Sequence, residues 1–273
     1  MLPSRPPSSE VAKGDVSMLF DSHTHTEFSA DSEMLAEDAL AVADRQGLGL
    51  VFTEHLDLES APPVDFSFDP EAYWEKYLPL RSAKLRLGIE VGMREKTLAG
   101  SRKFLERVPF DMVIGSIHFL EDKDIYLPEY YQGKDKAEAY HIYFREMAAN
   151  LRTHDFVDVL GHIDYITRKA PYEDREIDYG SFQEDIDEVL RACLETDTVL
   201  ELNTRRFGER RAVKELVPVY KRYREMGGQY VTLGSDAHTA EAIGAYFGEA
   251  RDFTEMLGLQ IASFAERRLV PCT

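Results

Sequence analysis

The chain has little cysteine, no long apolar segment and a shortage of positive charge. Its 273 residues include only two cysteines, Cys193 and Cys272, which lie far apart and outside any spacing typical of a metal site. This argues against a disulfide framework and favours a reducing cytoplasm as the location. Because no apolar run approaches the roughly 18 to 20 residues that a membrane-spanning helix needs, we expect no membrane partner.

Positive charge is scarce throughout the sequence. The 32 Lys and Arg residues oppose 50 Asp and Glu residues, which gives a formal net charge of −18. Nucleic-acid binding depends largely on Lys and Arg that neutralise phosphates, so the charge argues against a nucleic-acid partner. A small anionic ligand would need local help from a metal or a few arginines. The sequence makes no prediction of the oligomeric state.

The first 17 residues differ in composition from the rest. They read MLPSRPPSSEVAKGDVS, rich in Pro and Ser, and contain no apolar stretch of the kind found in a secretory signal. We expect a flexible leader over residues 1–17 and a single domain over residues 18–273.

Beyond the leader, short apolar runs alternate with amphipathic stretches. Strands are predicted at MLFDSH, LGLVFTEH, LRLGIEVG, DMVIGSIH, FVDVLGHID, TVLELNT and QYVTLGSDAH. Helices are predicted at SEMLAEDALAVADRQG (capped by Ser32 and ended by Gly47), DPEAYWEKYLPLRSAKLR (with Pro79 as a breaking point), DKAEAYHIYFREMAANLRTH, SFQEDIDEVLRACLETD and ERRAVKELVPVYKRYREMGG. This alternation indicates parallel strands covered by helices. Seven such runs fit a closed or nearly closed α/β barrel better than an open sheet.

Six of the eight histidines lie in or just after the predicted strands, together with acidic residues. The polar residues at these positions are His23, His25, Glu54, His55, Glu90, His118, His162, Asp164, Glu201, Asn203, Asp236 and His238. In β/α barrels the active site forms at the carboxyl ends of the strands. Packing alone does not explain six histidines at one end, because the polar rings would crowd together unless something bound their lone pairs.

The first two of these histidines are spaced for a shared ligand. Residues two apart in a strand point the same way, so His23 and His25 are able to present two imidazoles to one ion. A carboxylate from another strand would complete a site of nitrogen and oxygen donors. Such a site suits Zn²⁺, Mn²⁺ or Fe²⁺, and the ligand types do not distinguish among them.

Together these motifs resemble the polymerase-and-histidinol-phosphatase (PHP) superfamily of metal-dependent phosphoesterases. The resemblance runs from about Leu19 to the C-terminus and rests on HTHTEFSAD, TEH at 53–55, GIEVG, GSIH, GHID and GSDAH. It implies a distorted (β/α)7 barrel with a trinuclear metal site at the carboxyl ends of the strands. The pattern H-x-H-x-x-x-S-x-D followed by T-E-H-x-D is most similar to the histidinol-phosphatase branch, in which an aspartate is typical at the position of Asp31.

The resemblance implies a ligand set for three divalent transition metals. One metal would be held by His23, His25, Glu90 and Asp236, a second by Glu90, His118 and His162, and a third by Asp31, His55 and His238. Glu90 and Asp236 are also the implied catalytic residues: Glu90 bridges two metals, and Asp236 or a metal-bound water handles the proton. A metal-bridging hydroxide would attack phosphorus.

Several neighbouring residues have competing interpretations. Asp31 is also placed to cap the helix that follows it. Glu54 is outside the ligand set and could orient a ligand histidine. His141 and His154 fall outside the motifs and are interpreted as ordinary surface or core residues.

A phosphate monoester also needs bidentate donors, which arginine supplies. The resemblance points to one arginine shortly after GHID, where Arg168 fits. It points to a second after the sixth strand, where Arg205, Arg206, Arg210 and Arg211 are available and Arg206 is the predicted contact. Asn203 is predicted to contact the substrate or to fix this loop.

The resemblance therefore implies a phosphatase that hydrolyses L-histidinol phosphate to L-histidinol and inorganic phosphate, in histidine biosynthesis. Another small phosphate ester, such as a nucleotide or a sugar phosphate, is the alternative, because the motifs encode metals and phosphate rather than the leaving group. A polymerase accessory module is disfavoured by the length and the negative charge. An amidohydrolase-like barrel is disfavoured by Glu90 within GIEVG.

Overall fold

The structure is a computed structural model that describes residues 18–60 and 65–272. Its main sheet has the order β1-β2-β3-β4-β7-β8-β9-β10-β11. The strands are β1 (Phe20–Thr24), β2 (Gly49–Leu56), β3 (Leu85–Gly92), β4 (Val113–Ser116), β7 (Val159–Leu160), β8 (Val199–Asn203), β9 (Tyr230–Gly234), β10 (Gln260–Ala265) and β11 (Arg268–Pro271). Neighbours from β1 to β10 are parallel, and only β11 is antiparallel. The predicted parallel α/β fold is confirmed.

The sheet curls until its first strand meets its seventh. Thr24 in β1 forms a parallel bridge with Ala237, just beyond β9. The amide of Asp236 donates to the carbonyl of His23, and the amide of His25 donates to the carbonyl of Ala237, each at 2.9 Å. These bonds join β1 to the β9 end, so the carboxyl ends of seven strands surround one space, as the barrel prediction requires.

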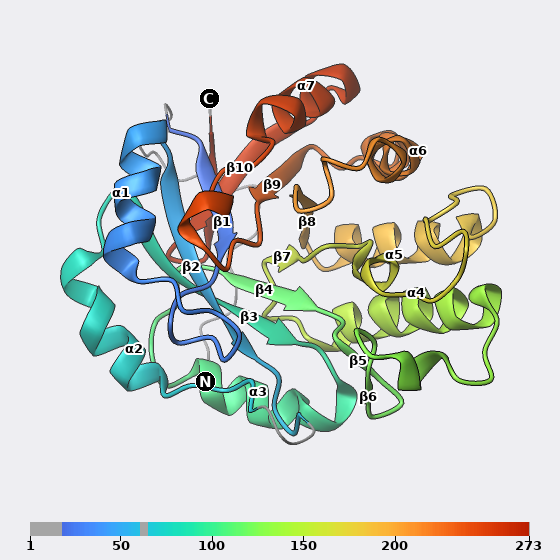
Figure 1. Ribbon diagram of the computed structural model, residues 1–273, viewed down its shortest axis with the longest axis horizontal. Helices are drawn as coiled ribbons and strands as arrows, with labels where there is room; N and C mark the ends of the chain where they lie inside the picture. The colour runs from blue at the N-terminus through green and yellow to red at the C-terminus, as the bar shows by residue number, and fades with distance from the viewer. Residues whose placement is uncertain (1–17, 61–64, 273) are drawn as a thin grey trace.

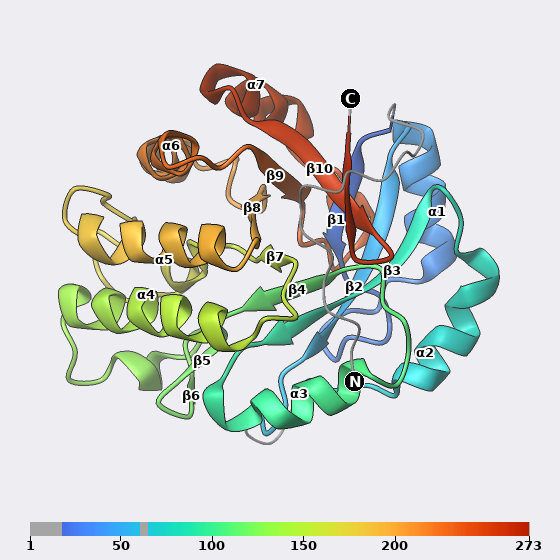
Figure 2. The ribbon, with the colours of Figure 1, turned by 180° about the vertical axis from the view of Figure 1, so that it is seen from behind.

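Helices cover the outside of this sheet (Figures 1 and 2). They are α1 (Ala36–Gln46), α2 (Pro70–Tyr77), α3 (Leu98–Leu105), α4 (Lys136–Thr153), α5 (Gln183–Glu195), α6 (Arg210–Glu225) and α7 (Phe247–Leu257). A small hairpin of β5 (Phe119–Leu120) and β6 (Lys123–Asp124) follows β4. No helix within the described ranges is long and apolar enough to cross a membrane.

The five predicted helices exist, with two differences in their ends. Helix α2 stops at Tyr77, and Leu78–Leu80 form a 3₁₀ turn that contains Pro79, as expected of a breaking point. Helix α1 begins at Ala36, so the prediction of a Ser32 cap is wrong. The Ser32 hydroxyl instead contacts the carbonyls of His25 and His238. Gly47 ends α1 in the left-handed conformation, as predicted.

The apolar core has two parts. The larger cluster lies between the sheet and the helices and includes Leu50, Phe52, Tyr73 and Tyr143. A smaller cluster gathers near the amino ends of the strands, from Phe20, Val51, Met112, Ile114, Val159, Val199, Ala262, Phe264 and Leu269. A cluster of histidines and carboxylates lies at the opposite, carboxyl ends of the strands. The predicted leader, residues 1–17, lies outside the described residues, and the single domain over 18–273 stays a prediction.

Candidate metal centre

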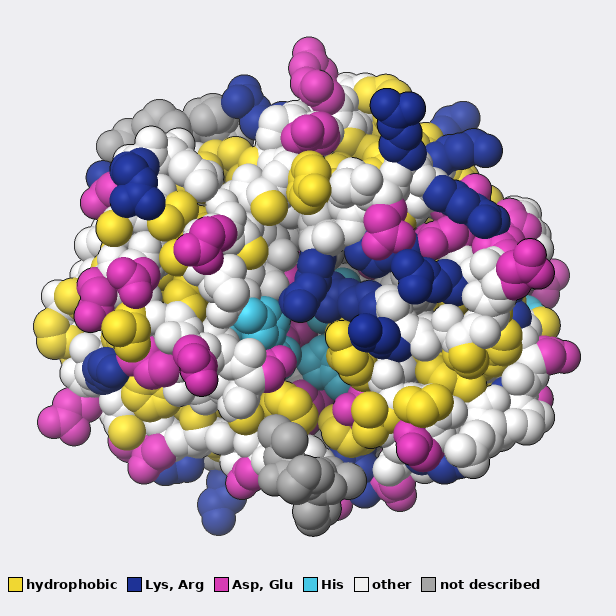
Figure 3. Space-filling view, in the orientation of Figure 1, with side chains coloured by type: hydrophobic (Ala, Val, Ile, Leu, Met, Phe, Trp, Pro, Cys, Tyr) yellow, Lys and Arg dark blue, Asp and Glu magenta, His cyan; other side chains and the backbone are white. Residues whose placement is uncertain are grey.

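Histidine side chains gather at the centre of one face of the molecule, in a hollow with Lys and Arg side chains along one side (Figure 3). They come from the carboxyl ends of different strands. Four groups of three residues each place one donor atom per residue within 4.8 Å of the others. The groups are His23, His25 and Asp236; His23, Glu90 and His162; His55, Glu90 and His118; and His25, His55 and His238. Eight of the nine predicted ligands are therefore in contiguous clusters.

The ninth predicted ligand, Asp31, borders the same clusters. Its Oδ2 lies 3.1 Å from His238 Nε2, and its Oδ1 lies 3.6 Å from His55 Nε2. The helix that it was also placed to cap has Leu35 at its N-cap position and no side-chain cap. The geometry therefore groups Asp31 with the histidines that were predicted to share its metal.

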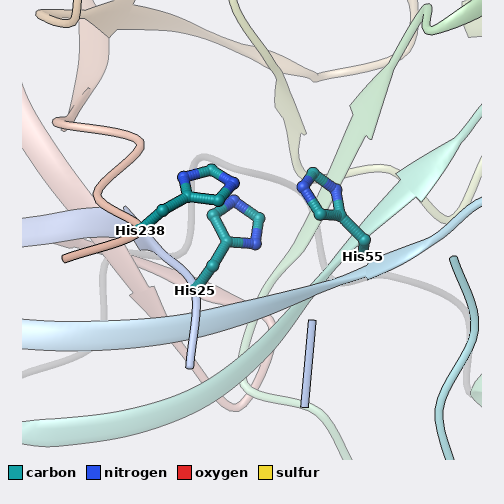
Figure 4. Close-up of side chains that lie close together, drawn as sticks. All are labelled: His25, His55 and His238. Carbon is teal, nitrogen blue, oxygen red and sulfur yellow. The ribbon is translucent and has the colours of Figure 1, made fainter. Parts of the chain in front are cut away.

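The imidazoles of His25, His55 and His238 face one another closely (Figure 4). The centroid of the His25 ring lies 4.1 Å from that of His55 and 4.4 Å from that of His238. The buried Nε2 atoms of His23 and His25 have no hydrogen-bond partner among the residues that the structure describes. Buried polar groups are normally paired, so unpaired imidazole nitrogens beside carboxylates fit a bound divalent metal.

In His23 and His118, a carboxylate holds the ring nitrogen on the other side of the imidazole. His23 Nδ1 lies 2.6 Å from Glu201 Oε1, and His118 Nδ1 lies 2.9 Å from Asp57 Oδ2. A carboxylate on one nitrogen fixes the tautomer and turns the free nitrogen toward a metal. Gly234 leaves space for the first pair, because a Cβ there would overlap Glu201 and the Cβ of His23.

A third arrangement of this kind passes through a serine. His25 Nδ1 lies 3.1 Å from Ser29 Oγ, which donates to Glu54 Oε2 at 2.7 Å. The same Ser29 oxygen accepts the backbone amide of His55 at 3.2 Å. Glu54 therefore orients His25 indirectly, consistent with the orienting role considered from the sequence.

Charge and burial set the protonation of the cluster. Burial and the imidazoles of His55 and His238 hold the pKa of His25 well below its usual value, which favours the neutral form that binds metals. Burial alone would raise the pKa of Glu90, but His23, His118 and His55 hold it well below its usual value. Glu90 is therefore ionised and able to bind more than one cation.

Asp236 has an unusual backbone conformation. Its φ of 54° lies in the left-handed region, which a non-glycine residue adopts at a cost of about 1–3 kcal/mol. The bond from its amide to the His23 carbonyl holds this conformation. As a result the carboxylate faces His25, with Asp236 Oδ1 at 3.5 Å from His25 Nε2.

The predicted substrate-binding residues separate into two groups. Arg168 reaches the cluster: its NH1 lies 2.7 Å from Asp236 Oδ2, and no residue in the described part of the chain forms a hydrogen bond with its buried Nε. Arg206 instead contacts Glu176, Glu209 and Thr167 in the surrounding loops. The neighbouring Arg205 lies 3.2 Å from Asp236 Oδ1 and is partly exposed. This geometry favours Arg205 over Arg206 as the second phosphate contact.

Asn203 contacts both Arg168 and Arg205. Its Oδ1 accepts from Arg168 NH2 at 3.3 Å and from the amide of Arg205 at 3.1 Å. Its Nδ2 donates to Glu201 Oε2 at 3.3 Å. Of the two roles considered for Asn203, these contacts favour fixing the loop.

Two of the orienting carboxylates received no role from the sequence. Asp57 stands in TEHLD, two residues after His55, and Glu201 stands two residues before Asn203. The signal available for both was their place in the sequence, because each is a carboxylate in or just after a predicted strand, as the ligand histidines are. His141 and His154 lie in or at the end of α4, apart from the four donor groups.

The sequence pattern of the PHP domain matches residues 21–205, about two thirds of the chain. The chain belongs to the PHP domain family. It is 41% identical over 250 residues to a probable histidinol-phosphatase from Clostridium acetobutylicum, covering 92% of this chain and 98% of that protein. It is 30% identical over 257 residues to the histidinol-phosphatase of Lactococcus lactis, covering 91% of this chain and 95% of that protein.

A solved structure supports the same relationship. The histidinol phosphate phosphatase of Lactococcus lactis, complexed with zinc, L-histidinol and phosphate, superposes with a TM-score of 0.87 at 30% identity. The match covers 92% of this chain and 98% of that one. Within the PHP family, this chain therefore falls in the histidinol-phosphatase branch.

Proposed function

We propose that this PHP protein is a phosphatase that hydrolyses L-histidinol phosphate to L-histidinol and inorganic phosphate, a step of histidine biosynthesis. The observation that carries the proposal is the set of buried, unpaired imidazole nitrogens beside Glu90, Asp236 and the Arg168 guanidinium. The relatives named histidinol-phosphatase support histidinol as the leaving group of the substrate. Its two free cysteines agree with a cytoplasmic location.

Three divalent metals, Zn, Mn or Fe, are proposed for the centre. His23, His25, Glu90 and Asp236 would hold one, Glu90 with His118 and His162 a second, and Asp31 with His55 and His238 a third. Clustered divalent metals neutralise phosphoryl oxygens and lower the pKa of a water that attacks phosphorus.

The protein's own groups bind the phosphate and take up the proton. Arg168 offers its buried Nε–H, and Arg205 offers a guanidinium at the rim of the same cluster. Burial alone would raise the pKa of Asp236, but Arg168 and His23 hold it well below its usual value. Asp236 is therefore ionised, as a metal ligand must be. Asp236 or a metal-bound water would take the proton that the attacking water loses, and that proton would pass to the departing histidinol oxygen as the ester P–O bond breaks.

The test is a phosphatase assay of the purified protein, stripped of metal and refilled with Mn²⁺, Fe²⁺ or Zn²⁺, against a panel of small phosphate monoesters. We expect more than one transition metal per chain, loss of activity on chelation, and a preference for histidinol phosphate of about 100-fold in kcat/KM, or roughly 2.7 kcal/mol. A fully active metal-free preparation would contradict the metal centre. A preference for a nucleotide or sugar phosphate would agree with the proposed metal centre but would contradict histidinol phosphate as the substrate.

A further inference from the structure

Arg206 is buried next to an arginine that faces the metal cluster. It is 6% exposed. Its guanidinium contacts Asp164, Thr167 and Glu176 in the segment after β7, and Glu209 in its own loop. NH1 donates to Thr167 Oγ1, and NH2 lies 2.5 Å from Glu176 Oε1. NH2 also lies 3.0 Å from Glu209 Oε2.

Each of the two segments carries one arginine of the cluster. Thr167 directly precedes Arg168 in the 3₁₀ turn Tyr165–Arg168 that follows β7. Arg205 directly precedes Arg206 in the loop between β8 and α6. Arg168 and Arg205 both reach Asp236, at 2.7 and 3.2 Å. Arg206 therefore joins the two loops that carry Arg168 and Arg205.

The Arg206 guanidinium and the Glu176 carboxylate that it contacts are both charged and buried. This favours a role in positioning the two loops over a role in stability alone. A buried ion pair often contributes no more to stability than apolar side chains of similar size, because desolvation offsets the attraction. A guanidinium fork does fix the relative positions of the groups that it bonds. Asn203 adds a second link, since its Oδ1 accepts from Arg168 and from the amide of Arg205.

We propose that Arg206 is a positioning residue, which sets the guanidinium groups of Arg168 and Arg205 relative to each other for binding a phosphate dianion. This rests on the proposed function. Arg206 itself contacts no substrate and acts through the turn after β7 and the loop after β8.

The test uses the metal-loaded full chain and compares Arg206→Lys and Arg206→Met with Arg267→Met. Arg267 is the matched control, because it forms an ion pair with the buried Asp158 next to the start of β7, at the opposite end of the strands. Calorimetric binding of inorganic phosphate is measured beside metal content, melting temperature, kcat and KM. Phosphate binding needs no turnover, and the wild-type assay on histidinol phosphate tests the proposed function separately.

We expect Arg206→Met to weaken phosphate binding and raise KM about tenfold or more, with metal content unchanged, and Arg206→Lys to recover part of the loss. Arg267→Met should lower the melting temperature and keep wild-type phosphate binding. In an Arg168→Ala background, Arg206→Lys should add little, because no pair of guanidinium groups is then left to be set relative to each other.

Wild-type phosphate affinity in both Arg206 variants would overturn the proposal, and so would equal losses in the Arg206 and Arg267 variants. If Arg206→Met does not fold, Glu176→Gln replaces it, since that change weakens one contact and keeps the guanidinium. Wild-type phosphate affinity in Glu176→Gln together with Arg206→Lys would then overturn it.

Discussion

His23 Nδ1 and Glu201 Oε1 lie 2.6 Å apart, and both side chains are buried at the carboxyl end of the barrel. The carboxylate holds the imidazole with its Nε2 free toward Glu90 Oε2, at 3.3 Å. Burial alone would lower the pKa of His23, but Glu201, Glu90 and Asp236 raise it well above its usual value. The same concentration of negative charge attracts a metal cation in place of the proton.

Glu201→Gln should lower metal affinity by about 10- to 100-fold, as loss of a partner behind a metal ligand typically does. Glu201 Oε2 also accepts the backbone amide of His162 at 2.6 Å, so the change affects a second candidate ligand. Metal titration of the stripped protein measures the affinity, with circular dichroism to verify folding. Wild-type affinity in a folded variant would show that Glu201 has no part in metal binding.

Glu90→Gln should lose metal as well as turnover. Glu90 belongs to two of the four donor groups, with Oε1 at 2.9 Å from His162 Nε2 and Oε2 at 2.8 Å from His55 Nδ1. An amide keeps the shape but removes the charge that would bridge two cations. Metal per chain and kcat measured on the same preparation check this.

Glu54→Gln is the matched control for that change. Glu54 is equally buried but reaches the cluster through Ser29, so Glu54→Gln should retain more metal than Glu90→Gln. Full metal occupancy and turnover in Glu90→Gln would refute the bridging assignment.

Most of the sheet and the candidate ligands were predictable because both follow strict patterns. Each of the seven predicted strands combines a buried apolar run with a polar residue at or near its end, and parallel strands bring those ends to one side. Helices α3 and α7 and strands β10 and β11 were not predicted. Helix α3 has eight residues and contains Gly100, and α7 starts after Tyr246 in the left-handed conformation, without a side-chain cap.

Which arginine faces the metal cluster could not be predicted from the sequence. Arg205 and Arg206 are adjacent in a loop, where no periodicity tells which side chain faces inward. The choice depends on Glu176 and Glu209, which take up the Arg206 guanidinium. The Ser32 cap was likewise replaced by tertiary contacts, in which Ser32 bonds to the carbonyls of His25 and His238.

His154 gives a prediction for the pH dependence of stability. It is 1% exposed, and burial lowers its pKa below the ordinary value of 6.5. The unfolded chain therefore binds the proton more readily, so the contribution of His154 to stability is present above about pH 6.5 and is lost as the pH falls through the window below it.

The measurement compares the melting temperature of the wild type with that of His154→Gln, from neutral to mildly acidic pH. The advantage of the wild type should shrink as the pH falls. Metal content measured at each pH separates this effect from release of metal by the cluster. An advantage that stays constant across the range would contradict the prediction.

Arg168→Ala separates phosphate binding from metal binding. Arg168 is proposed to bind the substrate phosphate, whereas His23, His118 and Asp236 are proposed to hold metal. The variant should therefore keep its metal and lose about 10- to 1000-fold in kcat/KM, which corresponds to roughly 1.4 to 4 kcal/mol for a charge-assisted contact in a desolvated site. A contact of equal strength in ground and transition states raises KM alone, and one that tightens during reaction lowers kcat as well. Arg168→Lys should recover only part of the activity, because it restores the charge without the fork.

Arg267→Ala, at the other end of the barrel, is the control and should retain kcat/KM. Loss on every phosphate ester in the panel would support a phosphate contact, and loss confined to histidinol phosphate would place Arg168 at the imidazole or amine end. Wild-type kinetics in Arg168→Ala would remove it from the site altogether.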